Sequence, residues 1–91
     1  MAFSQADKET ILAAVKLRIP VMGACPICRI PNWAIGDGFT LVMTQDSPKG
    51  VVIGGPVMPC VSIICTNCGN TVLLNVLILG LKDWYEKKRD T

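Results

Sequence analysis

The spacing of apolar residues near the N-terminus predicts a helix over residues 4–19. One face of this segment is apolar at helical spacing: Ile11, Leu12, Val15 and Ile19. Ser4 stands three residues before Asp7, a pattern typical of a capping box at a helix N-terminus. Pro20 disfavours helical geometry in the residue before it, which places the predicted end of the helix at Ile19.

Three later segments are predicted to be strands: residues 39–44, 57–64 and 70–79. Gly36-Asp37-Gly38 predicts a turn before the first of them, and residues 51–53 are a further short strand candidate. Pro59 lies inside the second strand. Because proline has no N–H for a ladder, it predicts an edge position or a bulge there.

The run of residues 72–79 is apolar at nearly every position, with Asn75 as the interruption. A strand with one face in water would alternate with polar residues, so both faces of this segment are expected to be covered. The N-terminal helix could cover one face, and a second subunit or another protein the other. The alternative is that two terminal helices bury both faces within one chain.

Residues 81–91 are predicted to be a basic tail or a short helix. The cationic residues of this end are Lys82, Lys87, Lys88 and Arg89, with Trp84 and Tyr85 among them. Basic residues interleaved with aromatic ones can hold single-stranded nucleic acid by stacking and by phosphate contacts. The alternative is a solvated helix whose aromatic side packs on the core.

The composition is that of one small globular domain spanning residues 1–91. The chain is 51% apolar and 18% charged, which excludes a disordered composition. A net charge of +2 argues against strong, sequence-independent nucleic-acid binding by the whole domain. A chain this short buries a limited core and often needs a metal or disulfides to stabilise it.

Four of the five cysteines form two C-x-x-C pairs, which we call the first cysteine loop (residues 25–28) and the second (residues 65–68). Two such loops facing each other supply four thiolates in the tetrahedral geometry of a closed structural zinc site. The chain contains no histidine, so an all-cysteine site is expected. We therefore predict one Zn²⁺ per chain, held by four ligands: Cys25, Cys28, Cys65 and Cys68.

The residues that follow the two loops differ. Gly69 follows the second loop, where the chain is expected to need a positive φ that glycine adopts without strain. Arg29 stands at the matching place after the first loop, and its charge could lie near the thiolates and partly offset their negative charge.

Alternatives to a zinc site follow from the same cysteines. Four thiolates could hold iron in a rubredoxin-type electron carrier. Two disulfides are disfavoured in a reducing compartment, and no βαβ pattern supports a thioredoxin-like motif. Cys60 lies in an apolar strand and is expected to be a small buried residue, with a fifth ligand or a reactive thiol as the alternatives.

Nothing in the sequence predicts catalysis or a small-molecule substrate. There is no histidine for acid–base chemistry, and four thiolates would leave no open position on zinc for water. The polar, acidic start is unlike a secretory signal, and the longest apolar run is about half the roughly 20 residues that span a bilayer. We expect a cytoplasmic protein without a membrane partner.

The order of loops and strands is that of a zinc ribbon, a small metal-bound α+β fold. We expect a three-stranded antiparallel sheet with two cysteine knuckles over residues 21–80, plus the N-terminal helix and a short C-terminal one. The two cysteine loops, with Trp33 after the first and Gly69 after the second, resemble a group of small bacterial and phage zinc-ribbon proteins. This resemblance implies four-cysteine ligation at the matching positions and says little about function.

The sequence leads to three functional hypotheses. The first is a non-enzymatic structural-zinc module that binds a protein partner, or forms a homodimer, through the apolar C-terminal strand. The alternative is a zinc ribbon that binds nucleic acid or a transcription complex through Arg29 and residues 82–89; transcription-associated ribbons suggest it by fold analogy alone. The third is the iron electron carrier.

Overall fold

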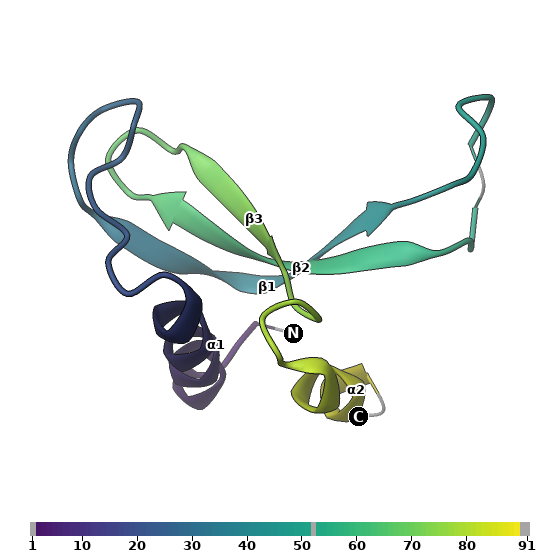
Figure 1. Cartoon of the computed structure of the whole chain (residues 1–91), viewed down its shortest axis with the longest axis horizontal. Helices are drawn as coiled ribbons and strands as arrows, with labels where there is room; N and C mark the ends of the chain where they lie inside the picture. The colour runs from purple at the N-terminus through teal and green to yellow at the C-terminus, as the bar shows by residue number, and fades with distance from the viewer. Residues whose placement is uncertain (1, 52, 90–91) are drawn as a thin grey trace.

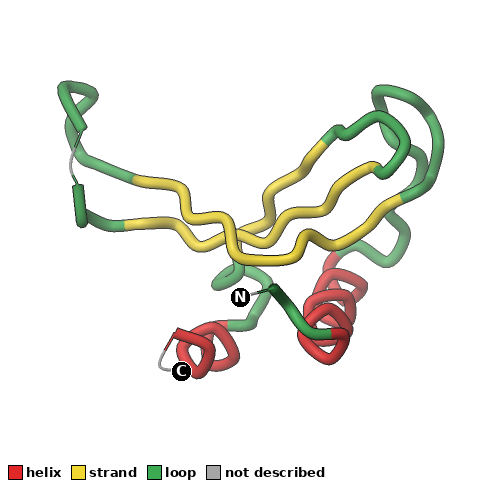
Figure 2. The backbone as a smooth tube through the Cα atoms, turned by 180° about the vertical axis from the view of Figure 1, so that it is seen from behind, coloured by secondary structure: helices red, strands yellow, loops and turns green. Residues whose placement is uncertain are grey.

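The computed structural model describes residues 2–51 and 53–89, which fold as two helices against one three-stranded sheet. The elements in chain order are α1 (Gln5–Arg18), β1 (Trp33–Met43), β2 (Val57–Cys65), β3 (Thr71–Asn75) and α2 (Lys82–Arg89). The strands are antiparallel in the order β1-β2-β3. Both helices lie on one side of the sheet (Figures 1 and 2). The N-terminal helix, the antiparallel sheet and the short C-terminal helix are thus confirmed.

Parts of three predictions lie outside the described residues. The predicted domain and its basic end include residues 1, 90 and 91, and the strand candidate at residues 51–53 includes residue 52. The two described residues of that candidate, Val51 and Ile53, are not in a strand.

The start of α1 has the capping box that the sequence predicts. Ser4 Oγ accepts a hydrogen bond from the Asp7 amide at 3.1 Å, and Asp7 Oδ2 accepts one from the Ser4 amide at 3.0 Å. Lys88 Nζ of α2 lies 2.7 Å from Asp7 Oδ1. The same carboxylate therefore caps α1 and holds α2 against its first turn.

The prediction of a turn at residues 36–38 is wrong, because these residues form a bulge inside β1. They oppose Ser62 alone, since the residues on either side keep regular pairs with β2: Ile35 with Ile63, and Phe39 with Val61. Gly36 approaches β2 so closely that a Cβ there would lie 2.0 Å from Ser62 Oγ. Glycine at this position lets the ladder continue past the extra residues.

The bulge also attaches α1 to the sheet. The Asp37 carbonyl accepts a hydrogen bond from the Phe3 amide, and Lys8 Nζ lies 2.7 Å from Asp37 Oδ1. The sequence Gly-Asp-Gly therefore does not end an element. It turns an acidic residue out of the strand toward the N-terminal helix.

Pro59 lies in the central strand, yet it interrupts no ladder. Its carbonyl accepts a hydrogen bond from the Val76 amide at 3.0 Å, so its main-chain groups point to the side of β2 where β3 runs. The β3 ladder ends at the pair of Cys60 and Asn75, and Cys60 is the residue that follows Pro59. The predicted edge position is thus confirmed for this end of β2.

The predicted strand over residues 70–79 is wrong beyond Asn75. The Asn75 Oδ1 atom accepts hydrogen bonds from the amides of Leu77 at 2.8 Å and Ile78 at 3.2 Å, which starts a series of turns. Val76 and Leu79 are buried in these turns, whereas Leu77 and Ile78 are exposed. The run is apolar at successive positions because it contains the end of a strand, up to Asn75, followed directly by turns that place Val76 and Leu79 in the core.

The core lies between the sheet and the two helices. Its buried members are Ile11, Ala14, Val15, Val61, Ile63, Val76 and Leu79. Phe39 is at the centre of an aromatic group beside them, with ring centroids 4.9 Å from Phe3, 5.4 Å from Trp84 and 5.2 Å from Tyr85. These rings dock α2 on the sheet.

Beyond the end of β3, the two longer strands continue as a two-stranded projection, which we call the arm (residues 40–60). Figures 1 and 2 show it extending away from both helices. Its strand pairs run from Thr40 opposite Cys60 to Met43 opposite Val57. The two cysteine loops lie at the other end of the sheet (Figure 1).

Candidate metal centre

The two cysteine loops have the same main-chain hydrogen bonds. In the first loop, the amide of Arg29 donates a hydrogen bond to the carbonyl of Cys25 at 2.7 Å. In the second loop, the amide of Gly69 donates in the same way to the carbonyl of Cys65 at 2.8 Å. The amide of the first cysteine in each loop also donates to the carbonyl five residues later, from Cys25 to Ile30 at 3.3 Å and from Cys65 to Asn70 at 2.8 Å. Each loop is thus closed on itself before any ion is considered.

The two loops also share one backbone conformation. Gly69 has φ of 87°, as expected, and Arg29 has φ of 65°. Arginine takes the left-handed conformation here at some conformational cost, because its Cβ is crowded in that region. The absence of a glycine after Cys28 therefore leaves the shape of the first loop unchanged.

Hydrogen bonds join the first loop to the second. The Asn32 carbonyl accepts from both the amide of Thr66 at 2.8 Å and its hydroxyl at 3.1 Å. Trp33 pairs with Cys65 in the ladder, and its indole Nε1 donates to the Gly23 carbonyl at 2.8 Å. Trp33 therefore fixes the chain that enters the first loop relative to the strand that carries the second.

This framework brings the four predicted ligands together. The Sγ atoms of Cys25, Cys28, Cys65 and Cys68 all lie within 4.8 Å of one another. Cys25 Sγ is 3.7 Å from Cys68 Sγ, and Cys28 Sγ is 3.5 Å from Cys65 Sγ. A tetrahedral ion with metal–sulfur bonds of about 2.3 Å needs sulfur atoms about 3.8 Å apart. The cluster is thus compatible with metal binding, and its donor set fits Zn²⁺ or iron.

Two thiols of the cluster are prepared for ionisation. Burial opposes ionisation of Cys25, but amides of Cys28 and Ile27 and the side chains of Cys68 and Asn70 outweigh it and lower its pKa to about 6. The pKa of Cys28 is also lowered, chiefly by the Ile30 amide and then by the Asn67 side chain. Metal ions bind the thiolate form, so these amides favour the form that a metal needs.

Cys68 shows the opposite shift because burial and the other cysteines of the cluster disfavour its thiolate. The Asn70 amide favours its thiolate, but burial and the neighbouring sulfur atoms of Cys25, Cys28 and Cys65 prevail and raise its pKa to about 11. Four thiolates cannot share this space without a cation. A divalent ion at the centre would remove the conflict and release the remaining protons.

Cys60 lies outside this cluster. It is fully buried in β2 with its Sγ 3.7 Å from the Met58 carbonyl, so the interpretation as a small buried residue is confirmed and a fifth ligand is excluded. Sequence reasoning missed Asn70, whose Nδ2 lies 3.6 Å from Cys25 Sγ. Its place two residues after a cysteine loop, where a side-chain amide can reach a thiolate, was the available signal.

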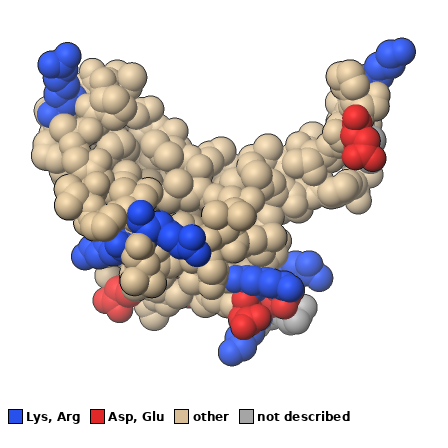
Figure 3. All heavy atoms as spheres, in the orientation of Figure 1, with Lys and Arg blue, Asp and Glu red and all other residues tan. Residues whose placement is uncertain are grey.

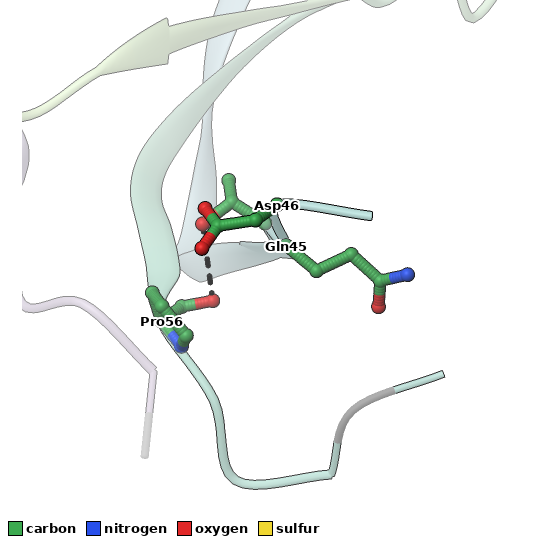
Figure 4. Close-up of a pocket in the computed structure, with 4 residues that line it drawn as sticks. Gln45, Asp46 and Pro56 are labelled. Carbon is green, nitrogen blue, oxygen red and sulfur yellow. Dashed lines mark hydrogen bonds between the residues drawn. The ribbon is translucent and has the colours of Figure 1, made fainter. Parts of the chain in front are cut away.

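A second candidate site, a hollow at the tip of the arm, does not resemble an active site. It measures about 280 Å³ and is lined by Thr44, Gln45, Asp46 and Pro56. Figure 4 shows Gln45 extending away from Pro56, while Thr44 Oγ1 donates to the Pro56 carbonyl at 3.2 Å. Among the described residues of the lining, Asp46 is the one ionisable group, so no acid–base pair converges there.

Comparison with known proteins found no relative of this chain. The chain matches no family model, no curated protein and no solved structure. Within the described residues, neither helix has the length and apolar character to cross a membrane.

Proposed function

We propose that this chain is a structural-zinc module without enzymatic activity, which associates with a protein partner through its apolar sheet. The observation that carries the proposal is the four-sulfur cluster, closed by self-bonded loops at one end of the sheet. The proposal agrees with the resemblance to small zinc-ribbon proteins. We expect it to act in a reducing compartment such as the cytoplasm, where the thiols stay free.

Zinc is the favoured ion because the site has the properties of a structural centre. Structural zinc sites are tetrahedral and closed, with all ligands from the protein. A site of this kind stabilises the fold and leaves no position for a substrate or a catalytic water. Bound zinc contributes on the order of 10 kcal/mol in small domains, enough to decide whether a chain of this size folds.

The remaining surface supports association rather than chemistry. Residues 38–45 and 50–81 contain no charged residue, although they include most of the sheet. Large apolar side chains stay exposed along it, among them Leu41, Met43, Val57 and Leu73. Because β3 ends at Asn75, the candidate surface moves from the C-terminal run to the longer strands of the arm.

Nucleic-acid binding is the less favoured function, since part of the basic and aromatic C-terminal end already makes contacts within the chain. Trp84 packs against Phe39, and so does Tyr85, so both rings contribute to docking α2 on the sheet. Lys88 pairs with Asp7. The iron electron carrier shares the ligand set and differs in the ion alone, so an iron-bound sample would be coloured.

The test is metal analysis of the purified full chain, with circular dichroism before and after a chelator is added. The proposal expects one zinc per chain and loss of the sheet signal on chelation. Cys60→Ala is the matched control, because it removes a thiol outside the cluster and should leave the zinc content unchanged. A chain that stays folded without metal would overturn the structural role.

A further inference from the structure

We propose that the outer edge of β1 in the arm is a homodimer interface, which pairs in antiparallel fashion with the same strand of a second copy. We call this segment, residues 39–43 of β1, the outer edge. This inference rests on the proposed function as an association module, and it names both the partner and the surface.

The main-chain groups of the outer edge can be assigned from the ladder. The Thr44 amide donates to the Pro56 carbonyl at 3.0 Å, so Thr44 turns its main chain toward β2. Successive residues of an antiparallel strand face alternate sides, so the residues that face away from β2 are Phe39, Leu41 and Met43. The position of Pro59, whose main chain points away from Leu41, agrees with this. Within the described residues, β1 has no strand on that side.

The open side of β2 in the arm is protected against pairing. Beyond the end of β3, the open side of β2 carries Pro59, and proline cannot donate to a new strand. The edge of β3 (Thr71–Asn75) also lacks proline and charge, but its Leu73 is less exposed than Leu41 and Met43 of the outer edge. The outer edge contains neither proline, glycine nor a charged residue, the devices that normally protect an exposed edge.

The side chains of the outer edge form an apolar strip. Leu41 is 54% exposed and Met43 is 61% exposed, and their register partners on the same face are Pro59 and Val57. On the face that Figure 3 shows, no charged atoms lie along the arm between its tip and the body. A two-stranded ribbon is marginally stable alone in water, so covering this strip would stabilise the arm.

A second copy fits this edge because the edge is complementary to itself. With a two-fold axis at Leu41, that residue faces its own copy, and Phe39 faces Met43 of the second copy. These pairs would exchange about six main-chain hydrogen bonds in total, two for each hydrogen-bonded pair. No like charges meet across the axis. A lipid surface fits poorly, because unpaired main-chain groups are costly in hydrocarbon.

The test measures the mass of the zinc-loaded full chain in solution by sedimentation. We expect a dimer at micromolar concentration, and we expect Leu41→Lys to raise the dissociation constant by about 100-fold, because two like charges then face each other. Leu17→Lys is the matched control: Leu17 is 83% exposed on α1, so the same charge there should leave the dimer intact. Zinc content and circular dichroism establish that each variant is folded.

Two further readouts identify the outer edge. A mixture of Leu41→Lys and Leu41→Glu chains should dimerise again, because residue 41 faces residue 41. In hydrogen exchange, the amides of Leu41 and Met43 should be protected in the dimer and exposed on dilution, whereas those of Thr40 and Val42 stay protected in both states. A zinc-bound, folded monomer, or a dimer that Leu41→Lys leaves intact, would overturn this inference. Failure to bind zinc would instead overturn the proposed function.

Discussion

Arg29 and Gly69 occupy equivalent positions after the two cysteine loops, and both have a positive φ, 65° and 87°. Each donates its amide to the first cysteine of its loop, Cys25 or Cys65. The same hydrogen bond thus imposes one conformation on two very different residues. Glycine adopts it freely, whereas arginine adopts it at a cost of about 1 kcal/mol.

The first prediction follows from this equivalence. Arg29→Gly should raise the free energy of unfolding of the zinc-loaded protein by up to about 1 kcal/mol, because the strain at φ of 65° is removed. Arg29→Ala keeps a residue with a Cβ at the strained φ but removes the guanidinium, so it separates the effect of backbone strain on stability from the effect of the charge. If Arg29→Ala stabilises as much as Arg29→Gly, the gain does not come from the backbone. Urea denaturation measures all three proteins.

The bulge in β1 gives the second prediction. A Cβ on Gly36 would lie 2.0 Å from Ser62 Oγ, whereas a Cβ on Gly38 would meet nothing within 4 Å. Gly36→Ala should therefore lower the free energy of unfolding by about 1 to 3 kcal/mol, and Gly38→Ala by much less.

Ser62→Ala provides the check on that clash. In the double variant the new Cβ at position 36 would keep 3.4 Å from the remaining Cβ at position 62, so much of the lost stability should return. A double-mutant cycle measures this coupling. Two independent, additive losses would argue that the bulge is not packed as described.

The third prediction concerns Asp7. Its hydrogen bond from Lys88, followed by that from the Ser4 amide, holds its pKa below the usual 3.8. A carboxyl with a lowered folded pKa stabilises the fold above its unfolded pKa, and this contribution disappears as the pH falls through the folded value. Asp7→Asn should thus be less stable than the wild type at pH 5 to 7, by a constant difference that shrinks below about pH 4.

Acid also releases thiolate-bound metal, so the Asp7 comparison needs a control at each pH. Glu9→Gln removes an exposed carboxylate from the same helix. Urea denaturation of the two variants side by side isolates the part that belongs to Asp7. Equal behaviour of both variants across the range would contradict the role given to the Asp7–Lys88 pair.

The sequence predicted the parts of this fold that depend on local chemistry. Ser4 and Asp7 are three residues apart and form the capping box, and the two C-x-x-C pairs converge as their spacing indicated. Periodicity likewise located the apolar face of α1, where Ile11 and Val15 are buried. The capping box and the helix face depend on near neighbours in the chain, and the convergence of the two distant cysteine pairs follows from the shared ligand chemistry of the pairs.

The errors arose where tertiary contacts decide the outcome. Gly36-Asp37-Gly38 has the composition of a turn, and becomes a bulge because Ser62 and the start of α1 lie beside it. Residues 76–79 look like a strand, and become turns because the Asn75 side chain accepts two amides. Arg29 gave no local sign of a positive φ, since its conformation comes from the loop that it closes.

The fourth prediction separates Cys60 from the cluster. Cys60→Ala should cost about 1 kcal/mol for the buried sulfur and leave one zinc per chain. Cys65→Ser should instead abolish stable metal binding and most of the cooperative unfolding transition, because one ligand of four is lost. Thermal unfolding followed by circular dichroism distinguishes the two outcomes.

The most direct test of the central claim is the metal content of the full chain, measured on the same sample before and after chelation while the fold is followed. The account predicts one zinc ion per chain, a colourless sample, and collapse of the sheet signal when zinc is withdrawn, with recovery when it is returned. Iron in place of zinc, or a chain that keeps its cooperative fold with no metal bound, would contradict it.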